Sequence, residues 1–103
     1  MNTIYKYVIL DAVGVHDELT LPIGSKLLSV ESQGMTVVLY AQIDTERKST
    51  EQYELFMYGT GHLVHHYRTA KFLGTAKMND GALMWHVFYK RKIWGELNGK
   101  VKN

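Results

Sequence analysis

The chain has 103 residues, of which 46% are hydrophobic and 21% charged, so we expect one folded domain with a modest core and not a disordered chain. It contains no cysteine, which excludes disulfides and thiolate metal sites. The net charge of +2 is unevenly distributed, because residues 1–89 hold seven Lys and Arg against nine Asp and Glu, whereas residues 90–103 hold five against one.

The N-terminal segment lacks the basic start and apolar stretch of a signal peptide, and no apolar run approaches the roughly 20 residues of a membrane span. We therefore expect a cytoplasmic protein without a membrane partner. Residues 1–89 are predicted to form a single β-rich domain. Residues 90–103 are predicted to be a basic C-terminal extension, which either aids solubility or meets phosphates or an acidic partner.

Strand signals run through the whole chain. Segments rich in β-branched and aromatic residues are bounded by turn residues, and in chain order they are 3–10, 18–22, 26–33, 35–44, 51–58, 72–77 and 83–89. Asp80-Gly81 favours a hairpin turn between the last two, because both residues tolerate positive φ. Only residues 62–71 and the tail offer a helical turn. The predicted fold is mainly β: a small antiparallel β-sandwich or strongly bent sheet of about six to seven strands, with at most one or two short helices.

Two of these strands carry continuous apolar runs, Val37-Val38-Leu39-Tyr40 and Leu83-Met84-Trp85, instead of alternating polar and apolar residues. Such strands need cover on both faces, and a second subunit would supply it. Tyr, Trp and Met, which are common at interfaces, point the same way. We therefore expect a homo-oligomer. The alternative is a compact sandwich whose central hairpin is buried within one chain.

Blocks spread over residues 3–88 form a recognisable pattern, and the most specific are Gly59-Thr60-Gly61-His62 and Gly81-Ala82-Leu83-Met84-Trp85-His86-Val87-Phe88. With them the chain resembles a family of small uncharacterised proteins found mostly in tailed bacteriophages and prophages. The resemblance implies a phage accessory protein that acts in the cytoplasm of an infected bacterial host. It implies no reaction.

The segment Gly59-Thr60-Gly61-His62 is the most informative short motif. Two glycines around a hydroxyl residue allow a tight turn whose N–H groups bind phosphate or carboxylate. The alternative is a turn in which the Thr60 hydroxyl and the His62 ring cap local backbone groups. The motif matches neither a Walker loop nor a dinucleotide fingerprint.

The remaining polar residues carry no catalytic signature. His62, His65 and His66 have no carboxylate among them, so we expect contacts with solvent or an anionic ligand and no metal site. Alternation places His86 on one face of its strand with Met84 and Phe88, and Trp85 on the other. A histidine between apolar neighbours is more typical of a hydrogen-bonded core residue than of a catalytic base. The serines lack a nucleophile elbow. We expect no enzyme activity and no cofactor.

The expected function is that of a non-enzymatic, oligomeric binder that sequesters a phosphate-containing small molecule, such as a nucleotide-derived immune signal of the host. The alternative is a protein–protein inhibitor or adaptor that binds a host or phage protein through a sheet edge or the basic tail. Nucleic acid is not expected as a partner, because residues 89–94 are one short basic-aromatic segment on an acidic body. The residues expected to contact the ligand are Gly59, Thr60, Gly61, His62, Arg68, Arg91 and Trp94.

Overall fold

A computed structural model describes residues 1–10, 16–64 and 69–92 of the chain. Its elements are β1 (Asn2–Leu10), β2 (His16–Pro22), β3 (Lys26–Gln33), β4 (Thr36–Asp44), β5 (Thr50–Gly59), β6 (Lys71–Met78), the 3₁₀ turn η1 (Asn79–Gly81) and β7 (Leu83–Lys92). Every strand segment predicted from the sequence is present, and the described residues contain no α-helix. The mainly β prediction is confirmed. Within the described residues, no helix has the length and apolar character needed to cross a membrane.

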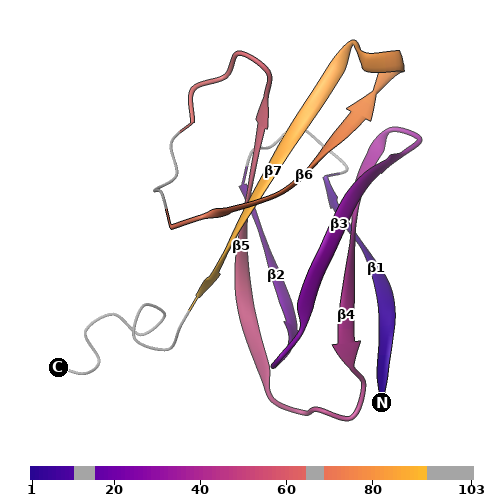
Figure 1. Cartoon of the computed structure of the whole chain (residues 1–103), viewed down its shortest axis with the longest axis vertical. Coiled ribbons are helices and arrows are strands. Elements are labelled where there is room, and N and C mark those ends of the chain that lie inside the picture. Colours follow the sequence, from indigo (N-terminus) through magenta and orange to yellow (C-terminus); the bar gives the residue numbers. More distant parts are fainter. Residues whose placement is uncertain (11–15, 65–68, 93–103) are drawn as a thin grey trace, which may run out of the picture.

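The strands form two antiparallel sheets around one core (Figure 1). One sheet has the order β1-β4-β3 and the other the order β2-β5-β7-β6. The core comes from alternate residues of each strand, because successive side chains of a strand point to opposite faces. Its fully buried members include Leu21, Val37, Leu39, Leu55, Met57 and Val87. Each large apolar side chain buried in this way contributes about 1.5–3 kcal/mol relative to an exposed one.

The two sheets approach each other where their edge strands β3 and β6 run close together. The Ser32 hydroxyl donates to the Lys77 carbonyl oxygen at 2.6 Å. A Cβ built on Gly74 would lie 3.1 Å from Cγ2 of Val30, so this glycine allows the close approach. These edges cover each other, and the strands at the other two sheet edges are β1 and β2.

The hairpin between β6 and β7 turns at the residues that the sequence indicated. The Ala82 N–H donates to the Asn79 carbonyl oxygen at 2.9 Å, with φ of 54° at Asp80 and 92° at Gly81. Positive φ at both central positions is the mark of a type I′ turn, whose twist matches that of the flanking strands.

The apolar run in β4 is covered within one chain. Val38 lies on the outer face of its sheet, opposite the inward-facing Val37 and Leu39, yet its side chain is only 1% exposed. Covering β4 therefore does not require a second subunit. In β7, Leu83 remains exposed.

Strand β7 continues to Lys92, past the expected domain boundary at residue 89. Its last residues pair with β5, from Glu54 opposite Lys90 to Gln52 opposite Lys92. The first part of the predicted basic extension is therefore strand, and residues 93–103 lie outside the described residues. Leu63 and Val64 are not helical, and residues 65–68 of the predicted helical turn also lie outside the described part.

Candidate binding site on the four-stranded sheet

The Gly-Thr-Gly-His segment forms a tight turn where β5 ends. The His62 N–H donates to the Gly59 carbonyl oxygen at 3.0 Å, and Gly61 has a φ of 93°, as at the third position of a type II turn. The His62 ring folds back so that its Nδ1 accepts the Gly59 N–H at 3.1 Å. The ring also lies edge-on to Trp85, with centroids 6.2 Å apart.

This geometry uses groups that an anion site would need. The N–H groups of Gly59 and His62 are both bonded inside the turn, and so is Nδ1 of His62. A Cβ on Gly59 would lie 3.0 Å from Cε1 of the ring, so glycine is required for this close contact. Of the two sequence hypotheses for the motif, the contacts favour the one in which the His62 ring caps the local backbone.

The hydroxyl of Thr60 points to a different partner, His86 of β7. Thr60 Oγ1 lies 2.8 Å from Nε2 of His86, and Thr75 Oγ1 of β6 lies 3.1 Å from Nδ1 of the same ring. We call this arrangement the His86 bridge. Hydroxyls both donate and accept, so together they satisfy either neutral tautomer of the imidazole. His86 is hydrogen-bonded, as the sequence indicated, but it lies half-buried on the outer face of the sheet and not in the core.

Four aromatic residues lie beside this bridge and form what we call the aromatic face: Phe56, Tyr58, Phe72 and Phe88. Strand register places Phe88 of β7 between Phe56 of β5 and Phe72 of β6. The Phe72 and Phe88 rings meet edge-on with centroids 5.4 Å apart, and Tyr58 meets Phe88 in the same way at 6.2 Å. Phe72, near the start of β6, is nevertheless 58% exposed.

A lysine completes this end of the face. Lys77 lies two residues beyond Thr75 on β6, so both side chains point outward, and Lys77 is exposed. Among the residues that the structure describes, no carboxylate pairs with Lys77. One region of the sheet therefore offers an exposed ring, a hydrogen-bonded imidazole with two hydroxyls, and a cation.

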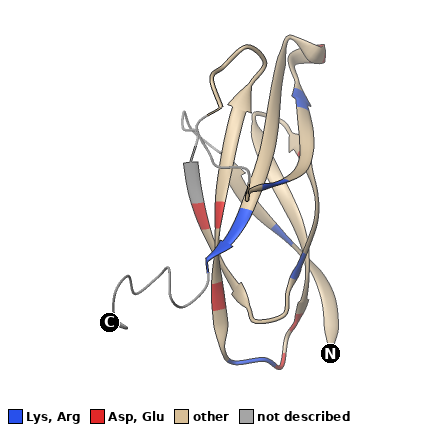
Figure 2. Cartoon of the chain, turned by 60° about the vertical axis from the view of Figure 1, so that its left-hand side comes forward, with Lys and Arg blue, Asp and Glu red and all other residues tan. Residues whose placement is uncertain are grey.

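The opposite end of β7 is basic, but carboxylates of neighbouring strands lie against it (Figure 2). Lys92 Nζ lies 2.8 Å from Oε2 of Glu18 and 4.0 Å from Oε2 of Glu54. The hydrogen bond to Glu18 raises the pKa of Lys92. Arg91 Nη1 lies 3.4 Å from Oε1 of Glu51. These ion pairs offset the positive charge of Arg91 and Lys92. This end of β7 is therefore a weaker anion site than the sequence alone suggests.

The structure separates the residues that the sequence nominated as ligand contacts. Gly59 pairs with Trp85 near one end of β5 and β7, whereas Arg91 pairs with Tyr53 near the other. At about 3.3 Å per strand residue the two ends lie about 20 Å apart, so within one chain a single small ligand cannot contact both. Thr60 belongs to the first end. Arg68 and Trp94 lie outside the described residues.

Near the start of β5, Glu51 joins three elements. Its side chain is only 10% exposed, and its Oε2 accepts the Gly24 N–H at 3.1 Å and the Tyr53 hydroxyl at 2.9 Å. Burial raises the pKa of Tyr53, and the hydrogen bond to Glu51 adds to the increase. With Arg91 on its other oxygen, Glu51 ties the turn after β2 to β5 and β7.

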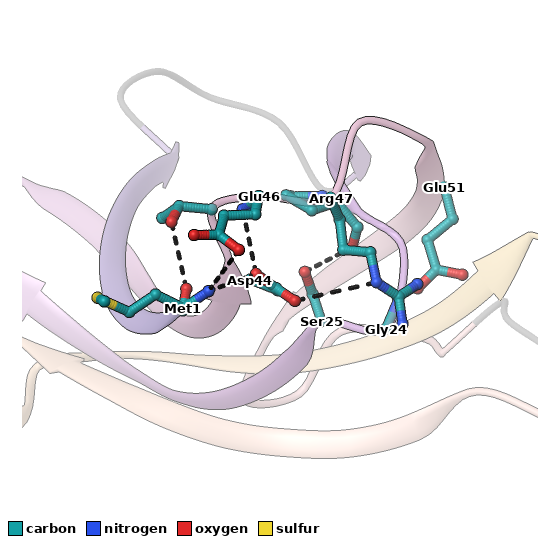
Figure 3. A network of polar contacts seen from close by, with 9 residues as sticks. Met1, Gly24, Ser25, Asp44, Glu46, Arg47 and Glu51 are labelled. Carbon is teal, nitrogen blue, oxygen red and sulfur yellow. Dashed lines mark hydrogen bonds and ion pairs between the residues drawn. The ribbon is translucent and has the colours of Figure 1, made fainter.

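Asp44 anchors the start of β1 in a second polar network (Figure 3). Its Oδ1 accepts the Met1 ammonium at 2.8 Å and the Glu46 N–H at 3.1 Å. These hydrogen bonds, the ammonium first, lower the pKa of the Asp44 carboxyl. Both networks hold strands together. Among residues 1–10, 16–64 and 69–92, no three His, Asp or Glu side chains are grouped to hold a metal ion, and His65 and His66 fall outside these ranges.

Sequence reasoning missed Phe72, Thr75 and Lys77 as members of a site. Strand alternation did place His86 and Phe88 on one face of β7, and the structure confirms this. The bulge in β6 between Phe72 and Gly74 brings Phe72 and Thr75 to the same face although they are three residues apart. Simple alternation puts them on opposite faces, so the sequence carried no direct signal for this grouping.

A family model, described as a domain of unknown function (DUF7352), matches residues 1–95 of the chain. No curated protein and no solved structure matches it.

Proposed function

The chain belongs to the DUF7352 family, and we propose that it is a non-enzymatic binding protein that holds a phosphate-containing small molecule against the outer face of its four-stranded sheet. Nucleotide-derived molecules are the ligand class that this face fits best. The observation that carries the proposal is Phe72, which is 58% exposed beside the His86 bridge. An open aromatic ring next to fixed polar groups is the usual composition of a site for a planar ligand.

The ring of Phe72 supplies the stacking surface. Phe88 supports it from β7 by an edge-on contact at 5.4 Å. A nucleobase that stacks on a protein aromatic ring gains about 1–3 kcal/mol, and any base can do so because every base has a π-face. This part of the site therefore sets the ligand class, a planar heterocycle, without selecting one base.

The polar groups supply orientation and charge. The Thr60 and Thr75 hydroxyls already bond to the two ring nitrogens of His86, which holds both hydroxyls in place before a ligand arrives. Each hydroxyl oxygen keeps a lone pair that can accept a hydrogen bond from the ligand. Lys77, exposed on the same face, is a point charge of the kind that pairs with phosphate. The base–phosphate geometry of a nucleotide matches this order of ring, polar groups and cation along β6.

The biological setting belongs to the same proposal. The resemblance to bacteriophage proteins supports an accessory role in the cytoplasm of an infected bacterial host. A homo-oligomer that sequesters a nucleotide-derived immune signal would lower the free concentration of that signal in proportion to the number of sites. The binding mode needs no bond to break, so the ligand leaves unchanged.

Native mass spectrometry of the purified protein with a panel of cyclic nucleotides and cyclic ADP-ribose isomers tests the proposal. The expected result is a stoichiometric adduct whose ligand is released with its mass unchanged. Phe72→Ala should lose the adduct, whereas Met35→Ala, which removes an even more exposed apolar side chain at the β3–β4 turn, should keep it. Retention by Phe72→Ala, absence of any adduct, or release of a hydrolysed product would contradict the proposal.

A second candidate is an inhibitor or adaptor that binds a host or phage protein along a sheet edge. The exposed apolar side chains of Ile4 and Val8 on edge strand β1 favour it. In that case Val8→Lys would abolish capture of the partner and Phe72→Ala would not. Under the ligand-binding proposal, Phe72→Ala loses the nucleotide and Val8→Lys retains it.

A further inference from the structure

Within the described residues, strand β1 is an open edge with the properties of an interface. It is the outer strand of the three-stranded sheet, whose other edge, β3, lies against β6 (Figure 1). An edge strand presents backbone N–H and C=O groups that another strand can pair with. β1 spans Asn2–Leu10, which is long for an edge strand, since short edges are one of the usual protections.

Most other protections against pairing are also missing from β1. The strand contains neither proline nor glycine, and its register is regular up to the irregularity between Val8 and Leu10. Lys6 is its single charged residue. A lysine usually blocks an edge by standing off it, but Lys6 Nζ donates to Oε1 of Gln33 at 3.0 Å, which draws the side chain across the sheet toward β3.

Two of the exposed side chains of β1 are aliphatic. Ile4 is 59% exposed and Val8 54%, and both lie on the outer face of the sheet. Val8 pairs across the strands with the buried Val38 of β4. A strand added beside β1 would cover Ile4 and Val8 from the side and extend this apolar strip.

The residue pattern of β1 selects what that added strand is. Ile4-Tyr5-Lys6-Tyr7-Val8 has the same order of residue classes in both directions about Lys6. In an antiparallel pair with a two-fold axis at Lys6, Ile4 lies opposite Val8 of the partner subunit, and Tyr5 lies opposite Tyr7 of the partner subunit. Aliphatic and aromatic cross-strand pairs of this kind stabilise a sheet, and self-complementarity is what an isologous dimer requires.

We infer that β1 pairs antiparallel with β1 of a second copy about this axis, which joins two three-stranded sheets into one continuous sheet. The register follows from the residue pattern, because an axis at Lys6 pairs Ile4–Val8, the symmetric part of β1 that ends before its irregularity, with the same range in the second copy. The one unfavourable contact is between Lys6 and Lys6 of the partner subunit. The hydrogen bond from each Lys6 to Gln33 of its own chain moves the two ammonium groups apart. The inference rests on the homo-oligomer of the proposed function, but not on its ligand, because the aromatic face is on the other sheet.

The absence of cysteine allows a direct test by disulfide trapping. Opposite residues of an antiparallel pair have Cα atoms about 4.5–5.5 Å apart, which lies within the range that a disulfide bridges. Lys6→Cys should therefore form a covalent dimer under mild oxidation. Lys26→Cys, an exposed position at the start of β3, should remain mostly uncoupled at the same protein concentration. Intact mass under non-reducing conditions measures the fraction of covalent dimer in both variants. The inference would be overturned if Lys6→Cys formed no covalent dimer, or no more of it than Lys26→Cys.

Light scattering after size-exclusion chromatography supplies the second readout. The unmodified protein should be a dimer or a higher oligomer. Val8→Lys should halve its number of subunits, for example from dimer to monomer. Its circular dichroism should stay unchanged, since Val8 is exposed in the single chain. A monomer at all concentrations would overturn both the inference and the proposed homo-oligomer. An oligomer that resists Val8→Lys and does not couple through Lys6→Cys would overturn the β1 interface alone. Failure to bind nucleotides alters neither readout, so it would count against the ligand proposal only.

Discussion

Thr60 Oγ1 lies 2.8 Å from Nε2 of His86, although the two residues are 26 positions apart in the chain. The contact connects the turn at the end of β5 to the outer face of β7. Its consequence is that Thr60, which its glycine-flanked motif nominates as a ligand contact, is oriented toward the aromatic face and away from the backbone of its own turn. The turn and this face therefore form one region of the molecule.

The His86 bridge should contribute measurably to stability. Thr60→Val and Thr75→Val each remove a hydroxyl bonded to the ring and should lower the free energy of unfolding by about 1 kcal/mol. Thr20→Val, at an exposed strand position on β2, is the matched control for the change in strand propensity. Urea denaturation measures all three. Losses at Thr60 and Thr75 no larger than the change at Thr20 would show that the bridge does not stabilise the fold.

The contact between Gly59 and the His62 ring should be specific to that pair. Gly59→Ala places a Cβ 3.0 Å from the ring and should cost about 1–3 kcal/mol of unfolding free energy, as in other overpacked sites. In a His62→Ala background the obstacle is absent, so the same substitution should cost much less. A double-mutant cycle measures this coupling. An equal cost in both backgrounds would contradict the ring position described above.

Tyr53 and Lys92 should make the fold sensitive to alkali. Both pKa values are raised, Tyr53 by burial and Lys92 by its hydrogen bond to Glu18, so the folded state holds protons that the unfolded state releases first. Their contribution is complete below the unfolded pKa values of about 10 and is lost as pH rises above them. Urea midpoints measured from pH 8 to 11 should fall above about pH 10.

Tyr53→Phe separates these two groups. It should lower stability at neutral pH, because Oε2 of Glu51 loses a donor, and it should also flatten the alkaline decline. Tyr40→Phe, which removes a hydroxyl that accepts a hydrogen bond from Gln33, is the control and should leave the slope unchanged. An unchanged slope in Tyr53→Phe would assign the decline to other groups.

Asp44 should act in the opposite direction, at low pH. Its lowered pKa means that its contribution is present above the unfolded value of about 4 and is lost as pH falls through the folded value. Asp44→Asn should therefore lower the melting temperature at pH 7 and weaken its dependence on pH below about 4. Glu31→Gln, at an exposed position on β3, should change neither. Parallel acid profiles for Asp44→Asn and the unmodified protein would contradict this role.

The strands were predictable because local pattern determines them. β-branched and aromatic runs, separated by glycine or polar turns, mark all seven, and Asp80-Gly81 marks one hairpin turn by its tolerance of positive φ. The orientation of the faces was not predictable from β7 alone, because it carries aromatic residues on both: Trp85 packs against the core, whereas Phe88 lies outside. Local pattern cannot decide which of two such faces is buried, because that depends on how the four-stranded sheet packs against the three-stranded sheet.

The composition of the candidate site depended on the same long-range information. The separation of Arg91 from Gly59 follows from the β5–β7 register, which no local motif reveals. The β6 bulge that brings Phe72 to the same face as Thr75 also has no recognisable motif in the sequence. The basic residues at the end of β7 looked available for phosphate because their carboxylate partners, such as Glu18, are distant in the chain.

Amide chemical-shift mapping tests most directly which face binds. ¹⁵N-labelled protein would be titrated with the same panel of cyclic nucleotides and cyclic ADP-ribose isomers. We predict that the largest shifts gather at Phe72, Thr75, Lys77 and His86, and that Phe72→Ala abolishes them. Shifts centred on Arg91 and Glu51, or a spectrum that no member of the panel changes, would contradict a nucleotide site on the outer face of the four-stranded sheet.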